Sequence, residues 1–523
     1  MQAHLFGADA VLNLSEAAIL LRVSEKTIGS MARQGKLPCQ RVGREWRFLK
    51  PALEGWLAGR TEVDENADVP ASLPVDASTS TIAALSEPAI SGCRDSAFTQ
   101  NRGQPLHRWV PWIAGFSASF VDGIFDSALR DAPRDVTVLD PFAGVGTTLV
   151  QALKRGYNVL GFEINPYAHL ACNAKLNLRH YDVGELREKI DAFRQFMGHV
   201  VADALIEPLN QPPPKFISRH PFFSQSIERQ VLFALDFIAS ERTDWIADLL
   251  RVAIGAQMVS FSNYTYEPSL GTRKAAGKSD IQDADVGGII ATKLEQMADD
   301  IAEGQRDTLG FDHNQSVTVL NRSCLDEMPT GAAGSASIVI TSPPYLNNYH
   351  YLRNTRPQLH WLGLMPENQR RALEEESFGK YWQTVRCEAP IGLAFGYPRL
   401  AAQLDDLRQT NSEKGPYGGP GWSNYAACYF NDTYRFCQRM GSFLRPDGLM
   451  VVVIGNNILQ GIEFQTDRYF AAIAEQVGFE TVNIHVVREK RTGSSIINST
   501  TRVGKTSAIL YETALELRWR GTA

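Results

Sequence analysis

The fold is decided by the stretch Val136-Thr137-Val138-Leu139-Asp140-Pro141-Phe142-Ala143-Gly144-Val145-Gly146-Thr147-Thr148. Its first four residues form a β-branched, apolar run of the kind that makes a short strand. Gly144 and Gly146 let the backbone beyond that strand pass close to a ligand, because neither residue has a Cβ. The helical stretch from Leu149 to Lys154 comes next, so the turn opens a helix, as loops that bind nucleotide-type cofactors do. A glycine pair alone is more often a plain turn, and a cofactor loop requires a further signal downstream.

An acidic residue stands at the end of the next predicted strand. That strand ends at Phe162, and Glu163 comes directly after it. An acid in this place, after a glycine-rich loop, can accept hydrogen bonds from both hydroxyls of a ribose. The distance along the chain, about twenty residues past the glycines, is the one that this arrangement requires. Asn165 suits either a cofactor contact or a turn before Pro166.

A second motif lies further along the chain, where an apolar run at 338–340 predicts a buried strand. The run leads into Thr341-Ser342-Pro343-Pro344-Tyr345. The two prolines fix the backbone, and neither can donate an amide hydrogen. Carbonyl groups in such a turn can accept hydrogen bonds from an exocyclic amine, while Tyr345 offers a flat face for stacking. A strand that ends in two prolines is also an ordinary loop, so the motif gains its meaning from the glycine-rich loop upstream.

Together these residues resemble the S-adenosylmethionine-dependent amino-methyltransferases of DNA, which methylate an exocyclic amine of a base. The resemblance implies that the first loop holds the methionine part of the cofactor, that the acid holds the ribose, and that the Pro-Pro turn holds the target amine. The implied cofactor-binding residues are Asp140, Pro141, Phe142, Ala143, Gly144, Gly146, Thr147, Thr148, Glu163 and Asn165. The implied catalytic residues are Ser342, Pro343, Pro344 and Tyr345.

The residue type at the start of the Pro-Pro turn bears on which base is methylated. In the family, Ser-Pro-Pro-Tyr is most typical of enzymes that act on N4 of cytosine, and Asp-Pro-Pro-Tyr of those that act on N6 of adenine. The resemblance therefore favours cytosine N4 and leaves adenine N6 as the alternative. The base must be swung out of the duplex, because its amine is otherwise paired. The hydroxyl of Ser342 and a carbonyl of the turn would then accept hydrogen bonds from the amine, and no covalent enzyme intermediate is needed.

Two features compete with this pattern or depart from it. The pair Pro38-Cys39 is similar to the nucleophile of cytosine C5 methylation, but it lies far from the cofactor loop, and we interpret it as a coincidence. In relatives, an acid close to the strand that precedes the Pro-Pro turn often contacts the adenine of the cofactor. Arg322 stands at that position here. Either Asp326 takes the role, or backbone groups and apolar walls hold the adenine.

The composition is that of a globular protein with more than one domain. The chain has 523 residues, 44% of them hydrophobic and 21% charged. It has neither an apolar run of about 18 residues nor a signal-peptide pattern, so we expect no membrane span and a cytoplasmic location. The seven cysteines are scattered and form no C-x-x-C pair, which predicts reduced thiols and no metal site. The net charge of −6 neither indicates nor forbids nucleic-acid binding, since local patches decide it.

The N-terminal part, residues 12–57, has the pattern of a small unit with its own basic charge. Two short helical segments precede a strand pair around residues 40–48, and the whole resembles the winged helix-turn-helix of excisionases and MerR-type regulators. Between Ser15 and Arg60 there are nine Lys or Arg residues against four Glu. We expect Lys26, Thr27 and Arg33 to face a major groove, and Arg41, Arg44 and Arg47 to touch phosphates or a minor groove. The alternative is a protein-contact module with a solvated basic face.

These patterns predict an α/β protein in three parts: a winged helix-turn-helix domain (1–60), a flexible linker (61–98) and a methyltransferase domain (99–523). Seven candidate strands suit the seven-stranded, mostly parallel, Rossmann-like sheet of these enzymes. They are 136–139, 158–162, 317–320, 338–340, 449–454, 482–487 and 515–519. The segment 106–125 resembles the one that covers the methionine end of the cofactor, although an aromatic core helix is the alternative.

Two stretches, about 168–315 and about 358–432, are insertions into this fold. We favour the first, mostly helical one for target recognition, against a structural cap or a dimer surface. We expect the second to end in a glycine- and proline-rich loop at 415–422.

The resemblance implies an enzyme with S-adenosylmethionine as cofactor and double-stranded DNA as partner, without metal. A role in restriction-modification, with a cognate restriction or defence protein, is an expectation at the level of the family. One alternative is a DNA-binding regulator whose methyltransferase-like domain does not catalyse. Another keeps the chemistry and changes the substrate to RNA or a protein amide, which the DNA-type N-terminal module disfavours.

Overall fold

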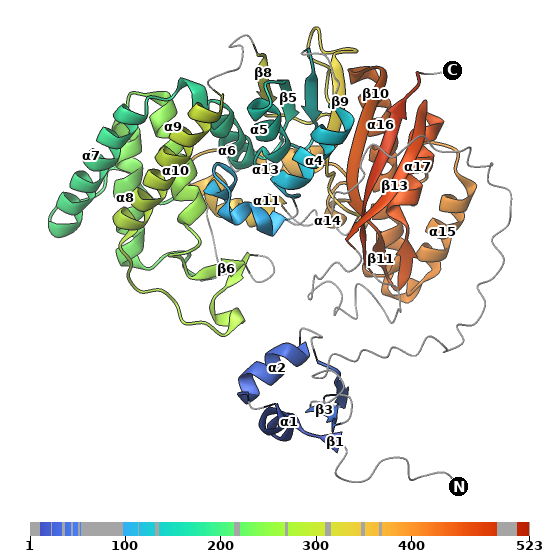
Figure 1. Ribbon diagram of the computed structural model, residues 1–523, viewed down its shortest axis with the longest axis horizontal. Coiled ribbons are helices and arrows are strands. Elements are labelled where there is room, and N and C mark those ends of the chain that lie inside the picture. Colours follow the sequence, from blue (N-terminus) through green and yellow to red (C-terminus); the bar gives the residue numbers. More distant parts are fainter. Residues whose placement is uncertain are drawn as a thin grey trace. The chain divides into compact units, whose positions relative to one another are not determined.

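The computed structural model describes residues 11–21, 23–33, 37–42, 45–50, 53, 98–112, 115–130, 135–213, 220–266, 270–308, 315–346, 351–365, 369–488 and 510–521 (Figure 1). The chain divides into two units, residues 1–83 and 84–523. The boundary between them falls inside the stretch that the sequence predicts as a linker, and of that stretch only Phe98 is described.

The N-terminal unit contains two helices and a small antiparallel sheet. Its elements are β1 (Val11–Leu12), α1 (Leu14–Leu20), α2 (Glu25–Arg33), β2 (Gln40–Val42) and β3 (Glu45–Leu49), and the strand order is β1-β3-β2. Asn13 and Glu16 cap α1 reciprocally, since the backbone N–H of each donates to the side chain of the other. Ser24 caps α2, because the N–H of Thr27 donates to Ser24 Oγ at 3.1 Å. The small core consists of Ala17, Ala18, Ile28, Ala32, Leu37, Phe48 and Leu53.

The large unit is built on a seven-stranded sheet, and the seven predicted strands are its strands. In sequence order they are β4 (Thr137–Asp140), β5 (Asn158–Phe162), β8 (Val317–Leu320), β9 (Ala336–Thr341), β10 (Leu444–Gly455), β13 (Phe479–Arg488) and β14 (Glu512–Trp519). The spatial order is β13-β14-β10-β9-β4-β5-β8. The contiguous strands β10, β9, β4, β5 and β8 are parallel, and β14 is antiparallel to both of its neighbours. The predicted fold class is therefore confirmed.

Helices cover both faces of this sheet, because neighbouring residues of each strand point to opposite sides. Val138 and Ile338 belong to a core shared with α4 (Ala118–Ala128), α5 (Thr147–Lys154) and α6 (Pro166–Leu176). Leu139 and Val339 belong to a second core on the opposite face, shared with α15 (Pro398–Gln409), α16 (Gly419–Phe443) and α17 (Thr466–Gln476). Figure 1 shows the resulting layers, with α16 and α17 on the side of the sheet away from the helical bundle.

The first predicted insertion forms that bundle. Its helices are α7 (Val183–Ala202), α8 (Gln225–Ser240), α9 (Asp244–Gln257) and α10 (Val286–Thr308). They extend the core on the α5 and α6 face, so the bundle is continuous with the sheet. The stretch is mostly helical, as the sequence predicts, and α10 is its longest helix, with 23 residues. Short elements complete this part: η4 (Leu178–His180), a hairpin of β6 (Tyr264–Tyr266) and β7 (Leu270–Thr272), and η5 (Lys274–Ala276).

The second predicted insertion, about 358–432, continues a series of short helices that starts at residue 351 and leads into α15 and α16, and from here on we include residues 351–357 in the second insertion. They are α11 (Tyr351–Asn354), α12 (Arg356–Trp361), α13 (Arg370–Glu376), α14 (Trp382–Val385) and η7 (Ser412–Tyr417). The prediction of a loop through residue 422 is wrong, because α16 begins at Gly419. A Cβ on Gly419 would lie 1.8 Å from the carbonyl oxygen of Leu407, so this glycine permits a close approach to α15. Pro420 lies in the first turn of α16, where proline is tolerated.

The remaining elements frame the sheet. They are η2 (Phe98–Gly103), η3 (His107–Trp109) and a hairpin of β11 (Asn457–Leu459) and β12 (Ile462–Phe464). Among the residues that the structure describes, no helix combines the length and the apolar character that crossing a bilayer requires. Within the same residues, no group of three or more His, Cys, Asp or Glu side chains is arranged to hold a metal ion.

Candidate active site

The sheet topology brings the glycine loop and the Pro-Pro turn together. Strands β4 and β9 are parallel neighbours, with Val138 opposite Ile338 and Leu139 opposite Val339. The loops after the two strands therefore leave the sheet at the same edge. A direct contact joins them, since Thr341 Oγ1 donates to Asp140 Oδ1 at 2.7 Å. Two motifs that lie nearly 200 residues apart in the sequence thus share one place in the fold.

Asp140 is the buried junction between the two loops. Besides Thr341, it accepts a hydrogen bond from the backbone N–H of Phe142 at 3.1 Å. Its side chain is almost inaccessible to water, and this burial raises its pKa to about 6, although hydrogen bonds from Thr341, Thr148 and Phe142 oppose the shift. Thr148, in the first turn of α5, also donates to the carbonyl of Ile340 in β9 at 3.4 Å. These contacts fix the start of the glycine loop against the neighbouring strand.

The two glycines of the loop are required by backbone conformation and by close packing. Gly144 has φ +53° and Gly146 has φ +88°, both in the left-handed region that disfavours side chains. A Cβ on Gly146 would lie 2.8 Å from Cys172 Sγ of α6, and a Cβ on Gly144 would lie 3.2 Å from the indole Nε1 of Trp112. The loop is therefore enclosed between α6 and Trp112.

A buried lysine supports the loop from beneath. Lys175 Nζ, on α6, donates to the carbonyl oxygen of Val145 at 2.8 Å, and its side chain is completely buried. Burial lowers the pKa of Lys175 to about 7. The sequence motifs did not identify Lys175 and Cys172 as parts of the site. The available signal was a lysine between Ala174 and Leu176, and it does not identify the partner.

Glu163 also organises the glycine loop. Its Oε2 accepts a hydrogen bond from the backbone N–H of Gly144, and its Oε1 accepts one from that of Asn165, both at 2.7 Å. Removal of this carboxyl from water raises its pKa to about 7, although the two backbone hydrogen bonds oppose the shift. The residue keeps some exposed surface, so a ligand can reach it. Asn321, at the end of β8, donates to the backbone carbonyl of Glu163 at 2.8 Å and holds it in place.

Asn165 acts as the N-terminal cap of α6. Its Oδ1 accepts hydrogen bonds from the backbone N–H groups of Tyr167 at 3.1 Å and Ala168 at 3.3 Å. Its Nδ2 donates to Thr355 Oγ1 at 2.8 Å, which connects α6 to the second insertion. Of the two uses that the sequence left open for Asn165, the structure places its side chain in the turn before the helix.

The Pro-Pro turn is held by hydrogen bonds to the strands β10 and β14. The hydroxyl of Ser342 donates to the carbonyl of Val453 in β10 at 3.0 Å, and Pro343 is buried. The hydroxyl of Tyr345 donates to Glu512 Oε1 in β14 at 3.3 Å, and Glu512 forms an ion pair with Arg488 at 3.3 Å. The oxygen of Ser342 retains lone pairs for a donor from a ligand, because its hydrogen is directed to Val453.

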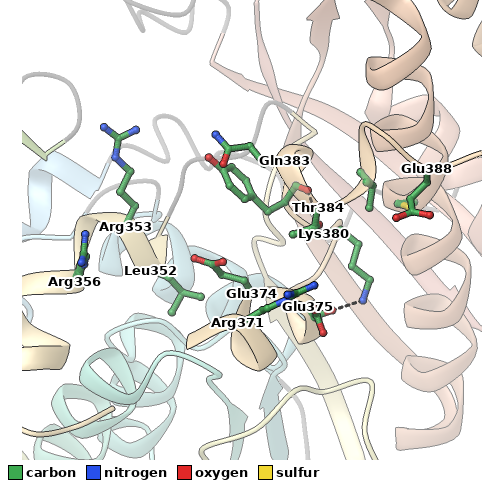
Figure 2. Close-up of a pocket in the computed structure, with 13 residues that line it drawn as sticks. Leu352, Arg353, Arg356, Arg371, Glu374, Glu375, Lys380, Gln383, Thr384 and Glu388 are labelled. Atoms are coloured by element: carbon green, nitrogen blue, oxygen red, sulfur yellow. Dashed lines mark hydrogen bonds and ion pairs between the residues drawn. The ribbon is translucent and has the colours of Figure 1, made fainter. Parts of the chain in front are cut away.

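A pocket of about 950 Å³ lies within the second insertion (Figure 2). It is lined by Leu352, Arg353, Arg356, Arg371, Glu374, Glu375, Lys380, Tyr381, Gln383, Thr384, Val385, Glu388 and Cys428. Figure 2 shows Arg353 and Arg356 on one side of this space and Gln383 and Thr384 on the other. Arg371 is paired with Glu375 at 2.9 Å.

Both walls of this pocket connect to the glycine loop. On one side, Tyr351 of α11 stacks on Trp112, with ring centroids 6.0 Å apart and an interplanar angle of 20°. On the other, Phe378, which lies between α13 and α14, contacts the ring of Phe142 edge to face at 5.2 Å. Residues next to the pocket lining therefore contact Phe142 of the glycine loop and Trp112, which covers Gly144. Residues 347–350, which connect the Pro-Pro turn to α11, lie outside the described part of the chain.

The candidate DNA-binding residues of the N-terminal unit lie on α2 and on the strand pair. The hydroxyl of Thr27 is hydrogen-bonded to that of Ser24 at 2.8 Å, at the start of α2, and Arg47 Nη1 donates to the carbonyl of Trp46 at 3.1 Å. Lys26 and Arg33 belong to α2 and Arg41 to β2, and their side chains are outside the described part, as is the whole of Arg44.

Comparison with known proteins gives two matches to protein families. Residues 131–173 match the family described as DNA methylase, and residues 11–61 match the family described as helix-turn-helix domain. The type II methyltransferase M.BsoBI of Geobacillus stearothermophilus is 24% identical over 439 residues, which are 76% of this chain and 83% of that protein. The type II methyltransferase M.AvaI of Nostoc sp. (strain PCC 7120) is 24% identical over 433 residues, 76% of this chain and 84% of the relative.

Among solved structures, the rRNA methyltransferase aviRa from Streptomyces viridochromogenes is 9% identical to this chain, with a TM-score of 0.28. The match covers 83% of this chain and 96% of the aviRa chain. The sequence matches confirm both predicted resemblances, to DNA methyltransferases and to helix-turn-helix domains. The chain is therefore similar to type II DNA methyltransferases over about three quarters of its length.

Proposed function

We propose that the chain transfers the methyl group of S-adenosylmethionine to the exocyclic amine of a base in double-stranded DNA, with cytosine N4 as the favoured target and adenine N6 as the alternative. The observation that carries this proposal is the 2.7 Å hydrogen bond between Thr341 and Asp140, which joins the glycine loop to the Pro-Pro turn. A methyl donor on the first loop and an amine on the second would then be close enough to react, and such positioning supplies much of the catalysis.

The residues around the glycine loop fit the cofactor. A loop without Cβ atoms at Gly144 and Gly146 admits a ligand close to the backbone. Each carboxylate oxygen of Glu163 accepts one backbone N–H and has a further lone pair, so the pair can accept hydrogen bonds from two ribose hydroxyls. When bound, S-adenosylmethionine supplies an activated methyl group, and the chain has to provide position and electrostatics.

The Pro-Pro turn has the acceptors that a methyl-accepting amine requires. The hydrogen of the Ser342 hydroxyl is directed to Val453, which turns the oxygen into an acceptor toward any ligand on its other side. Accepting hydrogen bonds from the amine draws its lone pair out of conjugation with the base ring and makes the nitrogen more nucleophilic. Tyr345, whose hydroxyl is bonded to Glu512, presents its ring next to the same acceptors.

The pocket beside the glycine loop supports a nucleic-acid substrate. Arg353 and Arg356 stand on one wall and Gln383 on the other, and guanidinium and amide groups are suited to phosphates and base edges. An extruded base needs such a space next to the Pro-Pro turn. We propose that this second insertion contacts the DNA strand that carries the target base. The helical bundle of the first insertion, which the sequence favoured for target recognition, shares its core with the sheet and has a supporting role described below.

Single-molecule sequencing of DNA from cells that express the chain tests the proposal, with a Ser342→Ala variant as control. We expect N4-methylcytosine in one sequence context with the wild-type chain and a much smaller methylated fraction of the same sites with the variant. N6-methyladenine in one context would select the alternative target. If the DNA of these cells is unmodified although the purified protein binds S-adenosylmethionine, the proposal is overturned. That result would favour a DNA-binding regulator or a different methyl acceptor.

A further inference from the structure

We infer that Asp300, on α10 of the inserted bundle, is a positioning residue for the cofactor site. It holds the segment Leu106–Trp112, which we name the strap, so that Trp112 lies against the glycine loop. The inference rests on the proposed function, because the place of Trp112 matters to activity only if that loop binds the cofactor. It gives the first insertion a task in cofactor binding that no sequence motif indicates.

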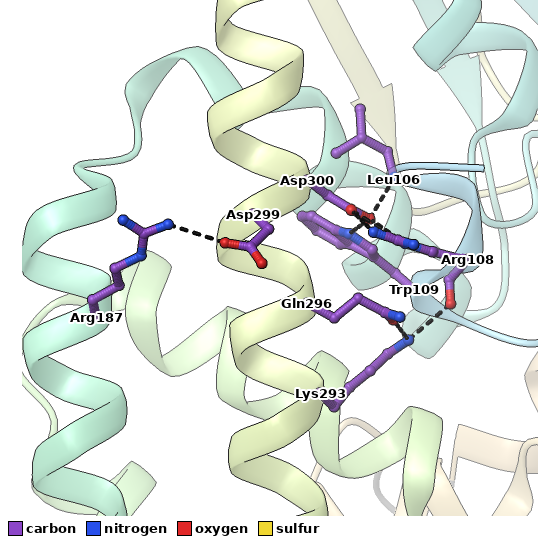
Figure 3. Close-up of polar contacts among 8 residues, drawn as sticks. All are labelled: Leu106, Arg108, Trp109, Arg187, Lys293, Gln296, Asp299 and Asp300. Atoms are coloured by element: carbon purple, nitrogen blue, oxygen red, sulfur yellow. Dashed lines mark hydrogen bonds and ion pairs between the residues drawn. The ribbon is translucent and has the colours of Figure 1, made fainter. Parts of the chain in front are cut away.

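The buried carboxylate of Asp300 accepts hydrogen bonds from three residues of the strap (Figure 3). The backbone N–H of Leu106 donates to Oδ2 at 2.8 Å, and the indole Nε1–H of Trp109 donates to the same oxygen at 3.0 Å. The guanidinium of Arg108 donates to Oδ1 from Nη2 at 2.5 Å and to both oxygens from Nε at 3.2 Å. The side chain of Asp300 is fully buried, so these donors replace the water that it gave up on folding.

The backbone of the strap depends on this contact. Leu106 has φ +66°, in the left-handed region where a side chain is strained, and it is fully buried. Asp300 accepts a hydrogen bond from the backbone N–H of Leu106. The carboxylate therefore helps to hold a backbone conformation that leucine disfavours by itself. A second contact from α10 lies beside it, because Lys293 Nζ donates to the carbonyl of Arg108 at 2.8 Å. The strap is thus held at both its N–H and its C=O groups by one helix.

The strap leads from α10 to the cofactor loop. His107 makes a buried hydrogen bond to Gln151 of α5 at 3.0 Å, which ties the strap to the helix that the glycine loop opens. Trp112 then lies over Gly144, since its Nε1 is 3.2 Å from where a Cβ of that residue would be. Its ring stacks on Tyr351 of the second insertion. Trp112 therefore joins the strap, the glycine loop and the pocket wall.

A neighbouring acid on the same helix gives a matched control. Asp299 forms an ion pair with Arg187 of α7 at 3.0 Å, and both side chains are largely exposed, at 68% and 58% (Figure 3). Asp300→Asn removes the negative charge that pairs with Arg108. It also replaces one accepting oxygen by an amide NH₂ group, which faces the donors of Leu106, Arg108 and Trp109. Asp299→Asn makes the same chemical change on the surface of the bundle, away from the strap.

Calorimetric titration of the full-length variants with S-adenosylmethionine tests the inference. We expect Asp300→Asn to weaken cofactor binding by about tenfold and Asp299→Asn to leave it unchanged. The measurement is made well below each melting temperature, which is determined separately. If Asp300→Asn does not fold, Trp109→Phe removes the indole donor to Asp300 together with one ring of the indole, and we expect about threefold weaker binding.

A double-mutant cycle with Trp112→Ala separates positioning from general stability. If Asp300 acts through Trp112, the Asp300→Asn change adds nothing to cofactor affinity in the Trp112→Ala background. If Asp300→Asn weakens cofactor binding as much in the Trp112→Ala background as in the wild-type chain, the inference is overturned. A wild-type affinity of the Asp300→Asn single variant would overturn it as well. Failure of the proposed function is distinguishable, because the wild-type protein itself would then bind no S-adenosylmethionine.

Discussion

The glycine loop and the Pro-Pro turn leave adjacent strands, yet they are held in different ways. Buried polar groups from three other elements support the loop, namely Lys175 on α6, Glu163 after β5 and Thr341 at the end of β9. In the described part of the chain, the turn is held by its own two prolines and by hydrogen bonds from Ser342 to Val453 and from Tyr345 to Glu512. We infer from this difference that the core of the protein preorganises the loop, whereas the turn is locally rigid and presents acceptors to a ligand.

The largest expected effect comes from a side chain inside the loop. Gly146→Val places a β-branched residue at φ +88° and a Cβ only 2.8 Å from Cys172 Sγ. We expect loss of cofactor binding by more than about a hundredfold and a destabilisation of about 3 kcal/mol or more. Calorimetry and thermal unfolding measure the two effects. Gly392→Ala, at an open position without positive φ, is the control, and a Gly146→Val protein of wild-type affinity contradicts the account of the loop.

The next largest effect separates the turn from the loop. Ser342→Ala removes an acceptor aimed at the amine and leaves every contact of the glycine loop in place. We expect the methylation rate to fall by about a hundredfold while the affinity for S-adenosylmethionine stays unchanged. Single-turnover methylation of DNA and calorimetric titration measure the two quantities. A parallel loss of both would show that the turn also holds the cofactor.

The third expectation concerns pH. The pKa of Glu163 is raised to about 7 in the free protein, and only the ionised carboxylate accepts hydrogen bonds from both ribose hydroxyls. Affinity for S-adenosylmethionine should therefore rise with pH through this value, by about tenfold between pH 6 and pH 8. Glu163→Gln should bind more weakly at pH 8 and lose the dependence. A wild-type titration that is flat over this range removes Glu163 from ribose binding.

A smaller effect is expected from the buried lysine. Lys175→Met keeps an unbranched side chain that is one atom shorter, removes the hydrogen bond to Val145 and also removes the cost of burying an ammonium group. We expect about fivefold weaker cofactor binding with little change in melting temperature. A large loss of stability with unaltered affinity would mean that Lys175 supports the core and not the loop.

The smallest effect concerns the pocket. Arg353→Ala should weaken DNA binding by about threefold and lower the slope of log affinity against log salt by about one, because one phosphate contact is lost. Cofactor binding should stay at the wild-type level. Arg187→Ala, on α7 of the bundle, is the matched control. If the slope of log affinity against log salt is the same for Arg353→Ala and Arg187→Ala, the DNA strand does not contact Arg353 in the pocket.

Much of the fold could be predicted from the sequence, because its parallel strands, apart from the edge strand β8, are largely buried and appear as short apolar runs. The start of β10 was predicted too late, at Leu449, since Pro446 and Gly448 indicated a turn. In the structure the strand begins at Leu444 and passes them with a shift in register. The glycines and the acid of the cofactor loop were visible as a local motif. The contacts that support them were not.

Lys175 and Asp300 illustrate why those supports escaped prediction. Each meets its partner through the tertiary fold, and the hydrogen bond from Trp109 to Asp300 spans 191 positions of the chain. Neither residue stands in a motif, and α10 itself lacks the acidic first turn that marks many helix starts. For Lys175 the available signal was a charge between Ala174 and Leu176, which does not reveal what the charge contacts. Asp300 follows Asp299 in a stretch with several charged residues and gives no such signal.

The most direct test of the shared site is a crystal structure of the protein with S-adenosylhomocysteine, the demethylated cofactor. The account predicts ribose hydroxyls at hydrogen-bond distance, about 3 Å, from Glu163, with the sulfur facing Ser342 and Pro343. A cofactor bound elsewhere, or one whose sulfur points away from the Pro-Pro turn, would contradict the claim that the two loops form one site for methyl transfer.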